Sequence, residues 1–253
     1  MTVSLKDAVS GTAAGVPFVA LPPVGIEGPA PMVAVWHPLG PAGSPAAMAA
    51  AVPLRGLAAW RVYLGLPRTG ERAVAPAPDA DFVLDRYTPI VDQAAAEFPA
   101  AWAVLRESLP VGDGPVAVVG ASAGGHAALT VLIRGEVPVA AAALINPAVR
   151  TESVVAVNER YGGFTYRWTA EARAAATPLD IVAAGSHVLA PVLLVLGEHE
   201  YPEFRPDQDA LFDVLAEPKH KVMVPGMDHY LAEEPGAAEQ AVEAWLAEHF
   251  TSG

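Results

Sequence analysis

Short apolar runs alternate with longer alanine-rich or amphipathic segments along most of this chain. Several runs are apolar throughout and rich in valine, isoleucine and leucine, which is typical of parallel strands covered on both faces. The runs expected to form strands are residues 16–21, 32–36, 60–66, 116–119, 140–145, 192–196 and 221–224. Because Pro22 and Pro23 end the first run, we expect it to lie at an edge of the sheet.

The segments between these runs have the composition of helices. Ser44 is a suitable N-cap for a helix over residues 44–51, with Pro45 in its first turn. Residues 85–109 predict one or two helices, broken near Pro99. The other expected helices begin after Ser122 and cover residues 178–184, 206–216 and 236–250. This alternation predicts an α/β fold, with a mostly parallel sheet and helices on both faces.

Residues 148–177 interrupt the alternation. They contain the densest aromatic cluster of the chain, Tyr-Gly-Gly-Phe-Thr-Tyr-Arg-Trp at residues 161–168. The segment is too short to be a domain, and no linker or internal repeat divides the rest of the chain. We therefore expect one α/β domain over residues 1–253, with a small cap over the functional site at about 148–177.

Composition narrows the possible partners. The net charge is −13 and basic runs are absent, which argues against nucleic acid and anionic membranes as partners. The chain contains no cysteine, so disulfides, thiolate catalysis and zinc–cysteine sites are excluded. No apolar run has membrane-spanning length, and residues 1–16 lack the apolar core of a signal peptide. We expect a cytoplasmic protein and leave a homodimer open.

The sequence Gly-Ala-Ser-Ala-Gly at residues 120–124 fits the pattern G-x-S-x-G. It follows the apolar run 116–119 and precedes a helical segment, so Ser122 lies in a strand-to-helix turn. Such a turn pushes the serine hydroxyl out to where a substrate can reach it. A Cβ at either flanking glycine would crowd the neighbouring strand or helix. We therefore expect Ser122 to be a nucleophile, the alternative being a glycine-rich packing turn.

Reactive groups follow four of the expected strands. They are residues 37–40 (His-Pro-Leu-Gly), Ser122, residues 198–200 (Glu-His-Glu) and residues 228–229 (Asp-His). Ligands of parallel α/β sheets bind at the carboxyl ends of strands, so these groups are expected near one another. Their order along the chain, nucleophile, acid and histidine, is that of one class of serine hydrolases.

Three motifs, at residues 120–124, 195–200 and 226–229, make the chain resemble an α/β-hydrolase of the compact bacterial esterase or dienelactone-hydrolase kind. The resemblance covers about residues 32–250. It implies that Ser122 attacks the substrate, that His229 is the general base, and that an acid after the strand 192–196 orients His229. In the family this acid usually lies three residues after the glycine that ends the strand, a position occupied here by Glu200.

Two alternatives stay open for the acid, because a loop register cannot be read from sequence. Glu198 competes with Glu200, and Asp228 is awkwardly placed because it adjoins His229. Two N–H groups are expected to bind the oxyanion. One is that of Ala123. The family commonly has His-Gly after the strand 32–36, whereas this chain has proline at position 38, which has no N–H; the resemblance therefore points to Leu39 as the second donor.

Aromatic side chains near these strand ends are candidates for substrate contact. They are Trp36, Tyr201, Phe164 and Trp168, each of which has core or cap packing as its alternative. No P-loop, no dinucleotide-binding Gly-x-Gly-x-x-Gly and no metal-ligand spacing is present, so we expect neither cofactor nor metal.

The residues predict a serine hydrolase acting on a carboxylic ester of small size, with thioester, lactone and peptide bonds open. The alternative is a non-hydrolytic protein of this fold, active in ligand binding, acyl transfer, or lyase or isomerase chemistry. Fold alone does not decide between them.

Overall fold

The computed structural model describes residues 8–231 and 233–250. Its centre is an eight-stranded sheet in the order β1-β2-β4-β3-β5-β6-β7-β8. The strands are β1 Val9–Ala13, β2 Val16–Leu21, β3 Met32–Trp36, β4 Trp60–Leu64, β5 Val116–Ala121, β6 Val139–Ile145, β7 Val192–His199 and β8 Lys219–Asp228. β1 and β2 pair antiparallel with their neighbours, and the strands from β4 to β8 are parallel. The predicted α/β class with a mostly parallel sheet is confirmed.

Helices follow the strands as expected. They are α1 Pro45–Ala51, α2 Thr88–Ser108, α3 Ala123–Arg134, α4 Thr151–Gly162, α5 Ala170–Ala176, α6 Ile181–Ala184, α7 Arg205–Val214 and α8 Pro235–His249. A π-helical turn, Phe82–Tyr87, leads into α2. Ser44 caps α1 by accepting a hydrogen bond from the N–H of Ala47. None of the helices in the described ranges is both long enough and apolar enough to span a membrane.

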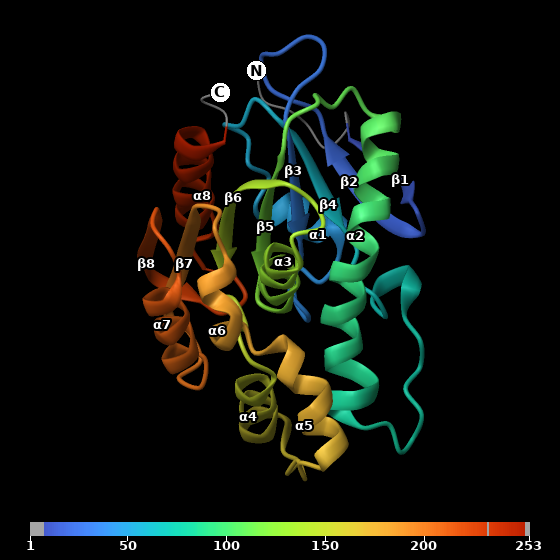
Figure 1. The fold of residues 1–253 in the computed structure, drawn as a ribbon, viewed down its shortest axis with the longest axis vertical. Helices are drawn as coiled ribbons and strands as arrows, with labels where there is room; N and C mark the ends of the chain where they lie inside the picture. Colours follow the sequence, from blue (N-terminus) through green and yellow to red (C-terminus); the bar gives the residue numbers. More distant parts are fainter. Residues whose placement is uncertain (1–7, 232, 251–253) are drawn as a thin grey trace.

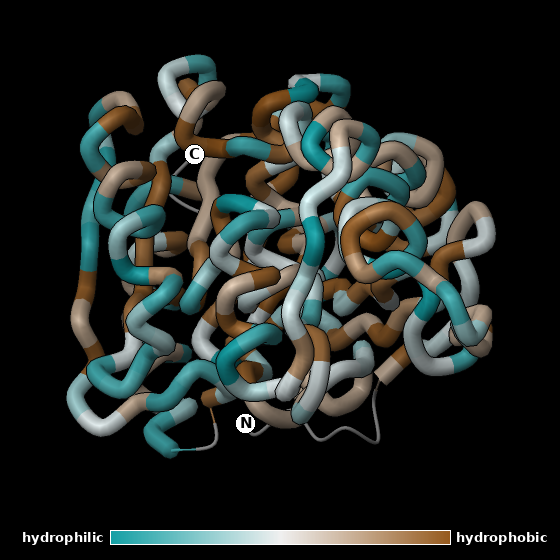
Figure 2. Tube along the Cα trace, turned by 90° about the horizontal axis from the view of Figure 1, so that it is seen from below, coloured by the Kyte–Doolittle hydropathy of each residue, from teal (hydrophilic) through white to brown (hydrophobic). Residues whose placement is uncertain are grey.

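Alternate residues of the strands β3, β4, β5, β6 and β7 enter two separate cores. In β3, Ala34 packs with α2 and α3, whereas Val33 and Val35 pack with α1 and α8. This division follows from the period of two in a strand, so uninterrupted apolar runs require helices on both faces. Hydrophobic segments run through the middle of the molecule, and many outer turns are hydrophilic (Figure 2).

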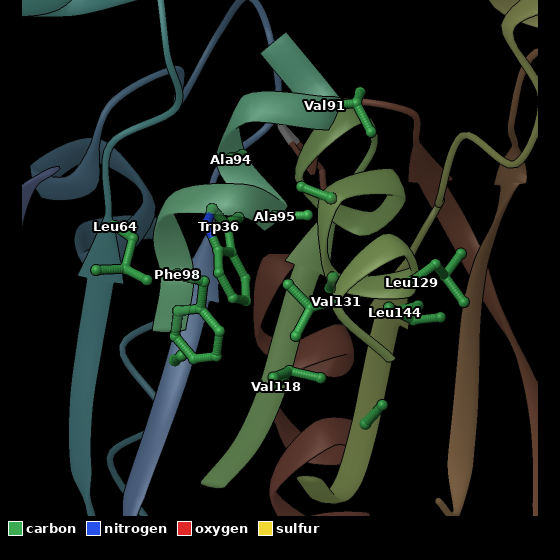
Figure 3. Packing of buried hydrophobic residues seen from close by; sticks show 14 of the residues in the cluster. Trp36, Leu64, Val91, Ala94, Ala95, Phe98, Val118, Leu129, Val131 and Leu144 are labelled. Carbon is green, nitrogen blue, oxygen red and sulfur yellow. The ribbon is translucent and has the colours of Figure 1, made fainter. Parts of the chain in front are cut away.

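Two expectations about the elements were wrong. β2 is not an edge strand, because β1 pairs with it on the outside. α2 is continuous through Pro99. Proline removes one backbone hydrogen bond, but burial of Phe98 and Leu105 against the sheet holds both halves of the helix in line. Figure 3 shows α2 lying over the strands at this place.

The strands that follow β3 along the chain are added on opposite sides of it, so the strand order reverses between β3 and β5. From β3 the chain passes to β4 on one side, and it then crosses over to β5 on the other side. Connections that leave neighbouring strands in opposite directions open a crevice at their carboxyl ends, where ligands bind in such folds. At one end of the molecule, residues 148–177 form α4 and α5, which lie side by side (Figure 1).

Candidate active site

Ser122 lies in a tight turn between β5 and α3. Its φ of 51° and ψ of −118° are strained for a residue with a side chain. The turn has no room for larger residues, because a Cβ on Gly120 would meet the backbone of Gly124, and one on Gly124 would meet the backbone of Trp36 and His37. Crowding between the turn, its helix and β3 therefore explains the two glycines of the motif.

A continuous chain of hydrogen bonds joins Ser122, His229 and Glu200. The Oγ of Ser122 lies 2.8 Å from Nε2 of His229, and Nδ1 of His229 lies 2.7 Å from Oε1 of Glu200. A carboxylate only accepts, so Nδ1 carries a proton and Nε2 accepts from the serine hydroxyl. All three residues are buried, with 6–8% exposure. The three predicted residues, each of which directly follows β5, β7 or β8, thus come together within hydrogen-bonding distance.

Glu198, the competing acid, points elsewhere. Its Oε2 accepts a hydrogen bond from the N–H of Gly226 at 2.9 Å, and the residue is exposed. Glu200 lies two residues further on, past the end of β7, where its side chain turns inward. Its Oε1 also accepts from the N–H of Tyr201 at 2.6 Å.

Asn146, which sequence reasoning treated only as the end of a strand, ties the loops of the acid and the base together. It is fully buried, and its φ is 44°. Its Oδ1 accepts from the N–H of Gly197 at 2.7 Å, and its Nδ2 donates to the carbonyls of Asp228 (2.9 Å) and His229 (3.3 Å). An asparagine immediately after a buried strand, at the edge that carries the reactive groups, was the available signal.

Three aromatic rings surround the imidazole of His229. The ring centroids of Tyr201, Phe204 and Tyr230 lie 5.0, 5.1 and 5.0 Å from that of the imidazole. Phe204 is stacked at an interplanar angle of 26°, so its electron-rich face lies against the imidazole. Such a face favours the charged form of an imidazole over the neutral form.

The loop after β3 is held by His37. The N–H of Leu66 donates to Nε2 of His37 at 3.0 Å, so the proton is on Nδ1, which donates to the carbonyl of Pro38 at 2.8 Å. Burial lowers the pKa of His37, and the bond to Pro38 opposes this. The C=O and N–H of a trans peptide point in opposite directions. The N–H of Leu39 therefore points away from the His37 ring, and Leu39 lies on the cavity.

A second buried histidine, His126, has a separate role. Its Nε2 lies 2.8 Å from the carbonyl of Leu179 and therefore donates, so Nδ1 accepts from the hydroxyl of Tyr87 at 2.9 Å. Burial lowers the pKa of His126 from the usual 6.5 to about 4, against smaller opposing effects of Leu179 and Asp180. This histidine is a neutral link between α3, the turn before α2 and the segment after α5.

We call Ser122, His229 and Glu200 together the triad. A cavity of about 880 Å³ opens beside it. Ser122, His229, Ala123 and Leu39 line it. The apolar part of the lining comes from the π-helical turn and α2 (Phe82, Tyr87, Ile90) and from α4 (Val154, Val157). The cap segment predicted at 148–177 therefore contributes to the cavity through α4.

Charged side chains on the cavity balance one another. Arg68 and Arg86 line it together with Asp79 and Asp85, and all four are exposed. Arg68 donates to the backbone carbonyl of Asp85 at 2.7 Å. This lining gives no strong preference for a charged substrate.

Of the four aromatic residues predicted to contact substrate, only Tyr201 lines the cavity. Trp36 is 1% exposed and packs edge-on against Phe98, with ring centroids 4.9 Å apart. Figure 3 shows it in the core beside α2. Phe164 is 37% exposed and packs on Phe82, while Trp168 packs on Tyr166 and Arg173. Helix packing, rather than proximity in sequence to a strand end, decided these positions.

Within the part of the chain that the structure describes, no three histidine, aspartate or glutamate side chains gather in a group that could hold a metal ion.

No protein-family model matches this chain, and no curated protein matches it in sequence. Solved structures do match it. Dienelactone hydrolase from Anabaena variabilis is 20% identical over 96% of both chains, with a TM-score of 0.63. Acetyl xylan esterase from Paenibacillus sp. R4 is 16% identical over 96% of this chain and 83% of its own, with a TM-score of 0.70. A puromycin hydrolase is 20% identical over 97% of this chain and 39% of its own, with a TM-score of 0.72. The chain has the α/β-hydrolase fold.

Proposed function

We propose that this protein is a serine hydrolase that cleaves a carboxylic ester through an acyl-enzyme on Ser122. The observation that carries the proposal is the unbroken chain of hydrogen bonds from Ser122 through His229 to Glu200 at a cavity of about 880 Å³. A serine hydroxyl is a weak nucleophile at neutral pH and needs an adjacent, oriented base. Here the base is buried, and its tautomer is fixed by the carboxylate.

In the proposed reaction, Oγ of Ser122 attacks the carbonyl carbon while Nε2 of His229 takes the hydroxyl proton. Glu200 stabilises the imidazolium so formed. The N–H of Ala123, in the unsatisfied first turn of α3, and that of Leu39 bind the developing oxyanion. His229 then gives its proton to the leaving alcohol. In the second half, His229 removes a proton from water, whose oxygen attacks the acyl carbon. The bond from the acyl carbon to Oγ then breaks, and His229 returns the proton to Ser122 as the acid leaves.

The cavity supports a small, largely uncharged substrate with an apolar portion. Its aliphatic and aromatic lining favours such a group, and its charged residues offset one another. The choice of an ester rests on two structural neighbours whose names denote a dienelactone hydrolase and an acetyl xylan esterase. The likeness to a puromycin hydrolase keeps amide cleavage as the competing outcome.

Labelling with a fluorophosphonate, followed by mapping of the modified peptide, tests the nucleophile. We expect modification at Ser122, loss of labelling in Ser122→Ala and strong slowing in His229→Ala. Ser153→Ala is the matched control, because Ser153 is equally buried but its hydroxyl only donates to the carbonyl of Arg150. A folded protein that resists the reagent would favour the non-hydrolytic alternative. The rates of hydrolysis of a p-nitrophenyl ester and of the p-nitroanilide of the same acid are then compared, to decide whether the protein cleaves esters or amides.

A further inference from the structure

Glu200 carries a second set of contacts beyond the base, and these contacts come from the helix that follows it. Oε1 of Glu200 accepts hydrogen bonds from His229 and from the N–H of Tyr201. Oε2 of Glu200 accepts one from Nε2 of Gln208 on α7 at 3.2 Å. The side chain of Glu200 is 0% exposed. In the described structure, Gln208 is therefore the donor that satisfies the outer oxygen of a buried carboxylate.

Gln208 is itself fully buried and has a second anchor. Its Nε2 also donates to the carbonyl of Pro147 at 3.1 Å. Pro147 belongs to the loop after β6, in which the N–H of Ala148 bonds the carbonyl of Ser122 at 3.1 Å. The amide thus connects the carboxylate to the loop that supports the nucleophile turn.

The orientation of this amide is forced by chemistry. Both groups facing Nε2 are acceptors, so exchanging nitrogen and oxygen would oppose acceptor to acceptor. Oε1 is then left buried with no hydrogen-bond partner among the described residues. An unpaired buried oxygen destabilises the fold, and an apolar side chain of the same length would avoid this. A local cost of this kind is expected where a residue serves a site.

We propose that Gln208 is a positioning residue that holds Glu200 charged and correctly directed toward His229. This inference rests on the proposed hydrolase function. Glutamate has one more rotatable bond than aspartate, so its carboxylate needs an additional contact to fix its plane. Residues 200–208 then make three contacts within the site. Glu200 orients the base, Phe204 stacks on the base, and Gln208 fixes the acid.

Other ionisable groups near the carboxylate can be separated from this effect. In the proposed reaction His229 is the group that takes the serine proton. Burial, and next a hydrogen bond to Tyr230, raise the pKa of Tyr201 to about 12, so its phenol stays neutral at working pH. On α7, Arg205 donates to the carbonyl of Glu198, and Asp207 is paired with Arg150 at 2.7 Å.

The test compares Gln208→Met, Gln208→Glu and the wild type by the rate of fluorophosphonate labelling from pH 5 to 9. Met keeps the length of the side chain and removes its donors. We expect labelling of Gln208→Met to slow about ten-fold with an intact fold, the size of a hydrogen bond to a charged group. In Gln208→Glu the new carboxyl faces two acceptors and can donate to Glu200 only while it is protonated, so we expect labelling close to the wild type at pH 5 and a growing loss relative to the wild type as the pH rises.

Leu211→Met is the matched control, because Leu211 is buried on the same helix. It should label like the wild type. If Gln208→Met labels at the wild-type rate and Gln208→Glu keeps the wild-type profile, Gln208 only fills space and the inference is overturned. If Gln208→Met unfolds, the profile of Gln208→Glu decides alone. A wild-type protein that is not labelled at Ser122 overturns the proposed function, and the role of Gln208 with it.

Discussion

The triad side of the cavity is held by buried hydrogen bonds, whereas the cap side is held by apolar packing. On the triad side, Ser122, Glu200 and His229 each lie just beyond the end of a parallel strand, and Asn146, which follows β6, joins the ends of β7 and β8. The cap side is the part of the cavity wall formed by the π-helical turn and α4. The direction of its side chains depends on how these helical segments pack against one another. Hydrogen bonds require direction and distance, while apolar contacts tolerate several arrangements. The first side can therefore be precise and the second adaptable.

The strongest test of this contrast is Asn146→Ala. Removing the amide leaves the N–H of Gly197 and the carbonyls of Asp228 and His229 without their partner. We expect kcat/KM on an ester to fall about 100-fold or more and the free energy of unfolding to fall by about 3 kcal/mol. Asn146→Gly tolerates the positive φ, so it separates backbone strain from the lost amide. Near wild-type activity in both variants would show that the strand ends need no such link.

Acid stability tests a buried polar link beside the cap side, that of His126 with Tyr87 and Leu179. With a folded pKa of about 4 and an ordinary value of 6.5, the unfolded chain binds a proton over this range and the folded protein does not. Stability is therefore complete above pH 6.5 and falls as the pH drops toward 4, by at most about 3 kcal/mol from this group. Urea unfolding at pH 7 and pH 4.5 measures it. In the double variant Tyr87→Phe/His126→Leu, the free energy of unfolding should fall less between pH 7 and pH 4.5. An unchanged fall would exclude His126 as its source.

The next test concerns the loop after β3, in which the proposed mechanism places the Leu39 oxyanion donor, since the peptide between Pro38 and Leu39 is fixed by the side chain of His37 rather than by a strand. His37→Leu frees the carbonyl of Pro38 and with it the direction of the Leu39 N–H. We expect kcat to fall about 30-fold with KM nearly unchanged, because an oxyanion donor acts mainly in the transition state. His37→Gln, which can donate and accept, should recover part of the rate. His187→Leu, at an exposed histidine, is the control.

The smallest effect is expected on the cap side. Phe82 lines the cavity, whereas Phe164 packs on its outer side. Phe82→Ala should raise KM for a substrate with a large apolar group about ten-fold and leave kcat nearly unchanged. Phe164→Ala should change KM less than three-fold, a bound set by its exposure of 37%. Equal effects of the two substitutions would mean that the cap closes on the substrate.

Sequence patterns were informative where chemistry and periodicity coincide. Apolar runs placed β3 at residues 32–36, as observed, because strands covered on both faces admit few polar residues. The places of Ser122 and His229, and of an acid after the strand 192–196, followed from strand ends that share one edge of the sheet, while the choice of Glu200 over Glu198 rested on the family resemblance alone. The roles of Asn146 and Gln208 escaped notice because a buried amide is visible in a sequence only once its neighbours in space are known.

By itself, the sequence determined the alternation of strands and helices, the strained turn at Ser122 and the order of the three triad residues. These depend on local spacing and on the equal direction of parallel strands. Only the tertiary structure decided that Glu200 rather than Glu198 faces His229, and that Trp36 enters the core while Phe82 lines the cavity. Each of those choices depends on packing between segments far apart in the chain, where a rotation of one residue turns a side chain from the cavity into the core.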